Sequence, residues 1–185
     1  VTGKSKSKVR VAFKNYGFAP VSQVYIDPRI DIAIVQIDPK LIPKEAKEAK
    51  LKCDGKVPSG TSVAAFGHPK GLSFSASRGI VSKYRFLSGR DVIQTDTAIN
   101  KGNSGGPLID MNTGLVIGIN KSSFSKSTGL SFAVPAKNVC IILDLFNENK
   151  NPSPITLPIR FAEDREAEDY LKVGSFYHKG KNIEI

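Results

Sequence analysis

The chain has 185 residues, enough for one domain with a hydrophobic core or for one unit of two lobes. Hydrophobic residues make up 40%, and sixteen glycines and eleven prolines are spread along the chain. This composition excludes a disordered or repeat protein and indicates a globular fold rich in turns. No apolar run approaches the roughly 18 residues that a membrane-spanning helix needs.

The formal net charge is +10, which could attract nucleic acid or an acidic partner. The lysines are scattered, however, and acidic residues interrupt their densest stretch, over residues 40–56. No aromatic residues alternate with these lysines as a base-stacking surface would require. We therefore expect a solvated basic surface and no nucleic-acid partner.

The first two thirds of the chain predict short strands separated by turns. These strands cover residues 9–13, 23–26, 33–37, 61–66, 74–83, 92–97, 107–109, 115–119 and 130–134. Short, regularly spaced strands with Gly and Pro between them indicate an antiparallel sandwich or barrel. Strands and helices do not alternate, so a parallel α/β sheet is excluded.

One helix is predicted after Pro135, because Val139, Ile142, Leu143 and Phe146 follow a helical spacing. Proline is common in the first turn of a helix. The polar stretch 147–154 ends this helix. Further along, the charged run 163–169 predicts a short exposed helix.

The chain has two cysteines, Cys53 and Cys140, which lie 87 positions apart. Two such cysteines form neither a disulfide framework nor a metal site. Cys140 falls in the apolar face of the predicted helix and Cys53 in a charged loop. We expect two free thiols rather than one disulfide.

The stretch GNSGGP at residues 102–107 has the composition of a serine nucleophile turn. Gly102 can adopt backbone angles closed to other residues, so that its N–H and that of Ser104 face one small volume. Two N–H groups arranged in this way can stabilise an oxyanion beside the nucleophile. We predict Ser104 as the nucleophile and the backbone of Gly102, Asn103 and Ser104 as the oxyanion hole. An ordinary Gly-Ser turn is the alternative.

The longer stretch QTDTAINKGNSGGPL at 94–108 resembles the nucleophile region of trypsin-like peptidases, and most of all their HtrA/Deg branch. Three further segments agree in the same order. These are DPRIDIAI at 27–34, FGHP at 66–69 with SRGIVS at 77–82, and GIN at 118–120 with LSFAVP at 130–135. The resemblance covers about residues 1–147, and residues 152–185 do not resemble a PDZ domain.

The resemblance implies an all-β fold, a trypsin-like double β-barrel with a C-terminal helix and a first barrel incomplete at its N-terminus. Residues 1–56 would be the remainder of the N-terminal barrel and residues 57–135 the C-terminal barrel. The helix would cover 136–150, and 151–185 would be an extension of unknown role.

Two acidic residues are candidates for the triad aspartate. The resemblance assigns the role to Asp31, which would fix the tautomer of an imidazole. An acidic residue at the solvated start of a strand is the alternative for Asp31. Asp27 is the neighbouring candidate, but Pro28 after it indicates a turn.

The triad histidine is not in this chain. In the family it lies shortly before a segment resembling residues 1–13. His68 lies in the turn that opens the second barrel and His178 in the tail, and we expect structural roles for both. The chain is therefore expected to be a fragment that is inactive by itself. A complete chain that has lost catalysis is the alternative.

The resemblance also places the substrate-binding residues. Ala98, six residues before Ser104, would form the floor of the specificity pocket, followed by Ile99. Neither is charged, so we expect cleavage after small or medium apolar residues. Asn120, Lys121 and Ser122 would form the edge strand that pairs with substrate, with Lys121 solvated. Asn103 replaces the aspartate that, in digestive relatives, binds a new N-terminus.

The function expected from this resemblance is that of a serine endopeptidase acting through an acyl-enzyme on Ser104, without cofactor or metal. Its partners would be extended polypeptide substrates, the missing N-terminal segment and a homo-oligomer. The family suggests protein quality control and an extracytoplasmic (periplasmic or secreted) or organellar location. A catalytically dead peptide-binding module is the alternative.

Overall fold

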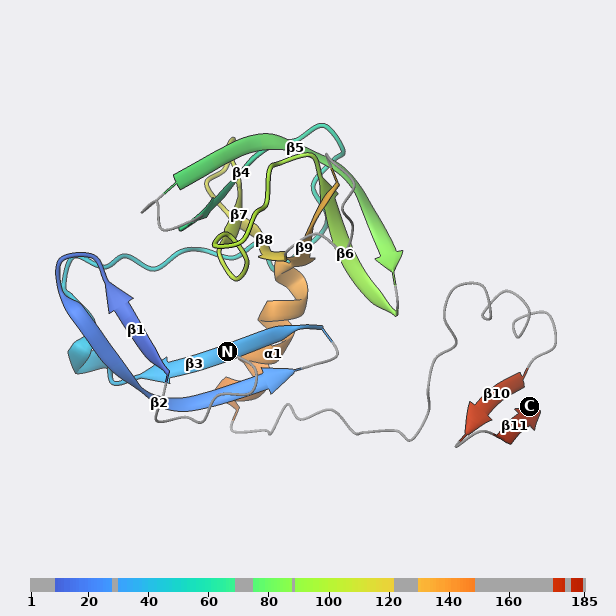
Figure 1. Cartoon of the computed structure of the whole chain (residues 1–185), viewed down its shortest axis with the longest axis horizontal. Helices are drawn as coiled ribbons and strands as arrows, with labels where there is room; N and C mark the ends of the chain where they lie inside the picture. Colours follow the sequence, from blue (N-terminus) through green and yellow to red (C-terminus); the bar gives the residue numbers. More distant parts are fainter. Residues whose placement is uncertain are drawn as a thin grey trace.

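The computed structural model describes residues 9–27, 30–68, 75–87, 89–121 and 130–148, together with the backbone of 175–178 and 181–184. Strands dominate this part of the chain, and they are joined by antiparallel pairings (Figure 1). The expected all-β class is therefore confirmed. Two bodies of sheet are present before the tail, an open sheet and a closed barrel.

The open sheet contains three antiparallel strands in the order β1-β2-β3. These are β1 (Arg10–Phe13), β2 (Gly17–Asp27) and β3 (Ile32–Ile37). A tight turn joins β1 to β2, where the Tyr16 N–H donates to the Phe13 carbonyl at 3.1 Å. β2 begins six residues before the predicted strand, because this hairpin also recruits the weakly hydrophobic residues 17–22 into the ladder.

A polar linker follows β3. It begins with a 3-10 turn, η2 (Pro39–Leu41), which the Asp38 side chain caps by accepting from the Lys40 N–H at 2.9 Å. The linker then runs beside the barrel, where Leu51 forms an isolated parallel bridge with Val116. Two backbone hydrogen bonds of 2.9 Å, from Lys52 N–H to Val116 O and from Val116 N–H to Lys50 O, fix this contact.

Six strands form the closed barrel. They are β4 (Ser62–Gly67), β5 (Ser75–Leu87), β6 (Arg90–Thr95), β7 (Pro107–Asp110), β8 (Val116–Lys121) and β9 (Ser131–Pro135). Their order around the barrel is β4-β5-β6-β9-β8-β7. Closure pairs both edges of every strand, so no ladder edge remains to be covered.

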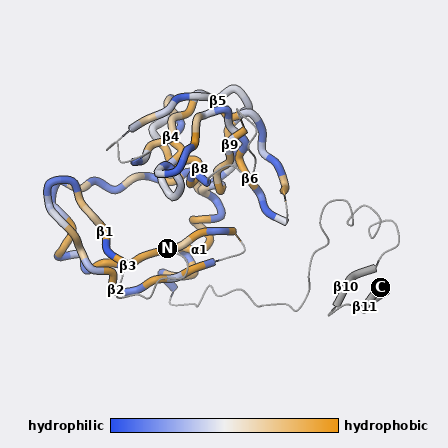
Figure 2. The backbone as a smooth tube through the Cα atoms, viewed as in Figure 1, coloured by the Kyte–Doolittle hydropathy of each residue, from blue (hydrophilic) through white to orange (hydrophobic). Residues whose placement is uncertain are grey.

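The barrel interior is filled by apolar side chains that alternate along the strands. Those with no measurable exposure are Val63, Ala65, Val81, Ile93, Leu108 and Ala133. Figure 2 shows hydrophobic stretches along β4 and β9. This core fixes the strand ends from which the loops of the site project.

One helix, α1 (Ala136–Asn147), follows β9 directly, as the spacing predicted. Figure 1 shows α1 between the barrel and the open sheet. Its buried residues Val139 and Ile142 pack with Tyr25 of β2 and Ile32 of β3. The open sheet therefore buries its apolar face against the helix rather than within a barrel of its own.

The tail adds a short antiparallel hairpin of β10 (Ser175–His178) and β11 (Lys181–Glu184). The sequence analysis missed it because two four-residue strands rich in polar residues carry little periodic signal. The helix predicted over 163–169 lies outside the described residues.

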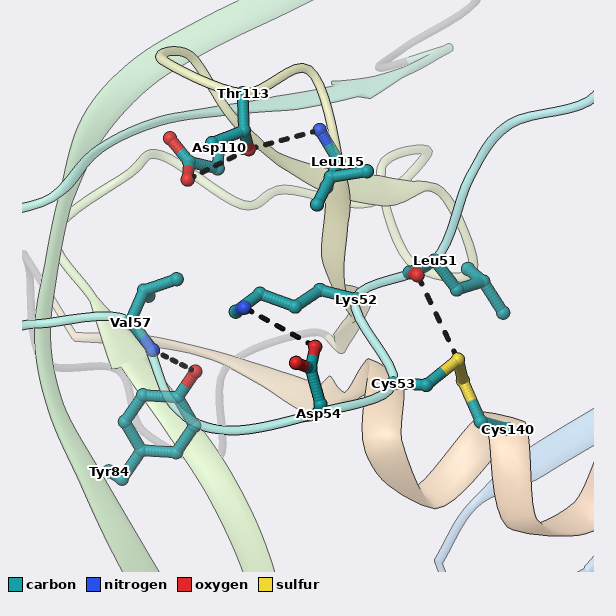
Figure 3. Close-up of polar contacts among 10 residues, drawn as sticks. All are labelled: Leu51, Lys52, Cys53, Asp54, Val57, Tyr84, Asp110, Thr113, Leu115 and Cys140. Atoms are coloured by element: carbon teal, nitrogen blue, oxygen red, sulfur yellow. Dashed lines mark hydrogen bonds and ion pairs between the residues drawn. A yellow bond between two sulfur atoms is a disulfide. The ribbon is translucent and has the colours of Figure 1, made fainter.

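Cys53 and Cys140 form a disulfide, so the expectation of two free thiols is wrong (Figure 3). Their Cα atoms lie 5.7 Å apart, within the range that a disulfide spans. The parallel bridge at Leu51 brings the linker back against β8, and α1 begins at the neighbouring strand β9. A separation of 87 positions gave no indication of this proximity.

Candidate active site

Ser104 lies on an exposed turn between β6 and β7. Two turn hydrogen bonds shape the backbone, from Asn103 N–H to Asn100 O at 3.0 Å and from Gly106 N–H to Asn103 O at 2.9 Å. Gly102 has φ +107°, a conformation that a residue with a Cβ avoids. The turn is thus rigid in its backbone and exposes the serine.

The side chain of Asn103 holds the turn from inside. It is 3% exposed, and its Nδ2 donates to the Ala98 carbonyl at 3.3 Å. The Ser77 hydroxyl donates to the same carbonyl at 2.7 Å. The Ala98 carbonyl therefore accepts from both Asn103 and Ser77, which links residues 98 and 103. The sequence analysis missed this structural role of Ser77. The motif SRGIVS, which contains Ser77, was the available signal.

The backbone N–H groups at and before Ser104 differ in whether they already donate a hydrogen bond within the protein. Asn103 N–H donates within the turn. Among the described residues, no hydrogen bond uses the N–H of Gly102 or of Ser104. These two N–H groups remain available for an anionic oxygen, whereas that of Asn103 would first have to leave Asn100.

Strand β8 connects the nucleophile turn to the open sheet. Gly105 N–H donates to Asn120 O, and Asn120 N–H donates to Gly106 O, both at 2.8 Å. The next residue, Lys121, places its Nζ 2.8 Å from Oδ2 of Asp31. Two adjacent residues of β8 thus contact the nucleophile turn on one side and the predicted triad aspartate on the other.

The two candidate aspartates have different surroundings. Asp27 ends β2 and is 2% exposed. Asp31 lies in the turn before β3 with φ +59°, and its side chain is 49% exposed. A positive φ in a residue other than glycine is uncommon and is often found at functional sites. The contact with Lys121 places Asp31 at the strand that holds the nucleophile turn.

Contrary to the prediction, Lys121 is not solvated. Its side chain is only 16% exposed and forms the ion pair with Asp31. The sequence analysis gave no sign of this pair, because the two residues are 90 positions apart and lie on different sheets. The expectation of a solvated lysine is therefore wrong.

The remaining predicted substrate-binding residues lie in three kinds of surroundings. Ala98 is exposed, whereas Ile99 is 6% exposed and belongs to the barrel core. Asn120 is buried, and its Nδ2 donates to Pro107 O at 3.0 Å. Ser122 lies outside the described residues. Of the two residues predicted at the pocket floor, Ala98 is therefore the exposed one.

The two histidines lie in different parts of the fold. The backbone N–H of His68 donates to Gly102 O at 2.9 Å, so this residue lies beside the nucleophile turn. His178 lies in β10, of which only the backbone is described.

Within the described ranges, no three His, Cys, Asp or Glu side chains gather where they could hold a metal ion. In the same ranges no helix is long and apolar enough to span a membrane.

A family model described as the trypsin-like peptidase domain matches residues 1–119. The chain belongs to the trypsin-like peptidase family. Among curated relatives of this peptidase-family chain is a probable periplasmic serine endoprotease, DegP-like, of Pseudomonas putida (strain W619). It is 42% identical over 137 residues, which are 70% of this chain and 27% of the relative. The chloroplastic protease Do-like 1 of Arabidopsis thaliana is 35% identical over 178 residues, 89% of this chain and 39% of the relative.

Solved structures of trypsin-like peptidases agree with this likeness. The HtrA-type protease AlgW, solved with a decapeptide, matches with a TM-score of 0.67 and 32% identity, over 85% of this chain and 50% of that one. The predicted HtrA/Deg-like resemblance and the trypsin-like fold are therefore confirmed. The chain spans about a quarter to a half of the length of these relatives, so the activity of a whole protein is a separate question.

Proposed function

We propose that this chain carries the nucleophile and the aspartate of a serine endopeptidase, with Ser104 and Asp31 in these roles. The observation that carries the proposal is the double contact of β8. Asn120 bonds the nucleophile turn through Gly105, and Lys121 beside it bonds Asp31. These two contacts link segments that are 73 positions apart in sequence and that adjoin different sheets, which supports the proposal.

The proposed reaction proceeds through an acyl-enzyme. Ser104 Oγ attacks the carbonyl carbon of the substrate while an imidazole takes its proton, and the carbonyl oxygen becomes anionic. The N–H groups of Gly102 and Ser104 would donate to that oxygen. The imidazolium then protonates the leaving amine, and water hydrolyses the ester. Asp31 would accept a hydrogen bond from the imidazole and hold its tautomer.

The general base is proposed to be a histidine in the sequence that precedes Val1. His68 is bonded through its backbone to the Gly102 side of the turn, whereas the accessible carboxylate of Asp31 lies at Lys121. Without an imidazole next to Asp31, the Ser104 hydroxyl keeps a proton that water cannot remove efficiently at neutral pH. The 185-residue chain alone is therefore proposed to be inactive.

Extended polypeptides are the proposed substrates, cleaved after small or medium apolar residues. Support comes from Ala98, which is exposed and uncharged, so that a buried Lys or Arg of the substrate would have no partner there. The backbone N–H and carbonyl of Asn120 already bond Gly106 and Gly105, so strand addition is proposed for the part of the chain that follows Asn120. The related protease AlgW was solved with a decapeptide, which fits the same substrate class.

A compartment outside the cytoplasm is the proposed location, and protein quality control in a homo-oligomer is the proposed setting. The Cys53–Cys140 disulfide supports the location, because disulfides persist mainly in oxidising compartments. The names of two relatives, one periplasmic and one chloroplastic, agree with it. Oligomerisation follows only from the family and would be measured by sedimentation.

Labelling with a fluorophosphonate tests the central proposal, because only an activated serine reacts. The protein is produced with the sequence that precedes Val1 in its gene, as wild type and as Ser104→Ala. We expect labelling of the wild type, none of Ser104→Ala, and a loss of at least about a hundredfold in rate for Asp31→Asn. Absence of labelling in the wild type, or labelling retained by Ser104→Ala, would contradict the proposal.

A second candidate function is a peptide-binding module without catalysis. The observation that favours it is the ion pair itself, since Lys121 occupies one oxygen of the aspartate that an imidazole would use. This candidate predicts no labelling but measurable affinity for extended peptides. Fluorescence anisotropy with an apolar decapeptide, on the same two proteins, would detect such binding.

A further inference from the structure

The ammonium group of Lys121 is largely withdrawn from water, with its side chain 16% exposed, and lies 2.8 Å from Asp31 Oδ2. A lysine in such surroundings needs a partner, because a desolvated, unpaired charge is costly. We propose that Lys121 is a positioning residue for the catalysis assigned to Ser104: it holds Asp31 in the orientation that a triad requires. This inference rests on the proposed function of the site.

The position of Asp31 on a turn explains why its carboxylate needs a contact that fixes its orientation. Asp31 lies in a turn at φ +59°, and its side chain is 49% exposed. A half-exposed carboxylate on a turn would rotate freely without a contact. The ion pair engages Oδ2 and leaves the lone pairs of Oδ1 to accept an imidazole N–H.

The lysine also sets where Asp31 lies relative to the nucleophile. Lys121 ends β8 of the closed barrel, whereas Asp31 precedes β3 of the open sheet. Next to Lys121, the carbonyl of Asn120 accepts the Gly105 N–H at 2.8 Å. The two sides of the site are thus linked by a short path through Asn120 and Lys121. Displacements of about 1 Å in such a path can cost on the order of a hundredfold in rate.

A surface ion pair of no consequence is the competing explanation. Exposed pairs contribute little, because water competes for both charges and the side chains lose freedom. The lysine of this pair is mostly buried and only the aspartate is half exposed, so its geometry is better defined than that of a surface pair. The two explanations predict different kinetics.

The test uses the same protein form as the labelling experiment and compares Lys121→Met, Lys121→Gln and Lys121→Arg. We expect kcat to fall about 10- to 100-fold in the two neutral variants, with KM changed less than about twofold, since the substrate does not bind Asp31. Lys121→Arg keeps the positive charge and is expected to retain kcat within about threefold of the wild type. Thermal unfolding of each variant shows whether it remains folded.

A double-mutant cycle separates positioning from other roles. Because Lys121 acts through Asp31, Lys121→Met should cause little further loss in an Asp31→Asn background. Unchanged kcat in both neutral variants, a loss confined to KM, or full additivity with Asp31→Asn would each overturn the inference. If the wild type itself fails to label and to cleave, the proposed function fails instead, so the two failures are distinguishable.

Discussion

The closed barrel and the open sheet each carry one half of the proposed site, and they are stabilised in different ways. The barrel has both edges of every strand paired and a core whose central side chains are fully buried. The open sheet has three strands, and Tyr16 and Phe18 on its first hairpin are more than half exposed. Its buried residues Tyr25 and Ile32 pack with α1, whereas Ala19 and Val21 are buried outside that cluster.

This difference matters for function. Ser104 is fixed by the barrel, through hydrogen bonds within one body of sheet. The position of Asp31 depends instead on how firmly the open sheet packs against α1 and on its contact with β8. The disulfide from the linker to α1 and the ion pair from Lys121 are therefore expected to affect the aspartate half of the site more than the serine half.

Removing the disulfide is expected to have the largest effect on stability. Closing a loop of this length lowers the entropy of the unfolded chain, and the loss in Cys53→Ser should be about 4–5 kcal/mol. Differential scanning calorimetry should show a midpoint lower by roughly 10–15 °C. A reductant should lower the wild type to the same midpoint and leave Cys53→Ser unchanged. A wild-type midpoint that does not respond to the reductant would contradict the prediction.

Gly67→Ala tests the barrel half of the site. A Cβ at this position would lie 2.5 Å from Gly102 O and 2.6 Å from Asn103 Cα, so the nucleophile turn must move. We expect kcat/KM, or the rate of fluorophosphonate labelling, to fall about a hundredfold. Gly89→Ala is the control for the added methyl group, since its Cβ meets no atom within 4 Å and the strain of its φ of +73° falls in the β5–β6 turn. A labelling rate for Gly67→Ala equal to that of the control would show that the turn adapts.

A matched pair of core truncations compares the two bodies directly. Val63→Ala removes fully buried methyl groups from the barrel, and Val21→Ala removes the same groups from the open sheet, where the side chain is 8% exposed. We expect losses of about 2–3 kcal/mol and about 1 kcal/mol, because the open sheet can relax around the vacated space. Urea unfolding measures both. Equal losses would mean that the sheet is packed as tightly as the barrel.

Tyr84→Phe has the smallest expected effect and tests how the linker is attached to the barrel. The Tyr84 hydroxyl accepts the Val57 N–H at 3.3 Å (Figure 3), and losing this bond should cost about 1 kcal/mol. Burial raises the pKa of Tyr84 above its ordinary value of 10.0, although the Val57 N–H and Lys52 oppose the shift.

The raised pKa of Tyr84 also predicts how the stability difference between the wild type and Tyr84→Phe changes with pH. A raised pKa means that the folded state binds the phenol proton more tightly than the unfolded state. The associated stability is complete below pH 10.0 and is lost as the pH rises through the shifted value. The advantage of the wild type over Tyr84→Phe should therefore shrink above pH 10. An advantage that grows over the same range in urea unfolding would contradict the assignment.

The sequence by itself determined the features that depend on neighbouring residues. The GNSGGP stretch predicted a turn at Ser104, the short strands predicted the antiparallel class, and the spacing from Val139 to Phe146 predicted α1. Each of these signals lies within about fifteen residues. The backbone preferences and hydrophobic periodicity behind them act locally, so they can be read without knowing the fold.

Only the tertiary structure decided the contacts between distant segments. Cys53 meets Cys140 because the linker pairs with β8, and Lys121 meets Asp31 because α1 holds the open sheet against the barrel. Ile99, predicted next to the floor of the specificity pocket, packs in the barrel core. Residue spacing does not specify distances across two sheets, since these follow from how the whole core packs. The serine could thus be read from the sequence, whereas the lysine beside its proposed aspartate could not.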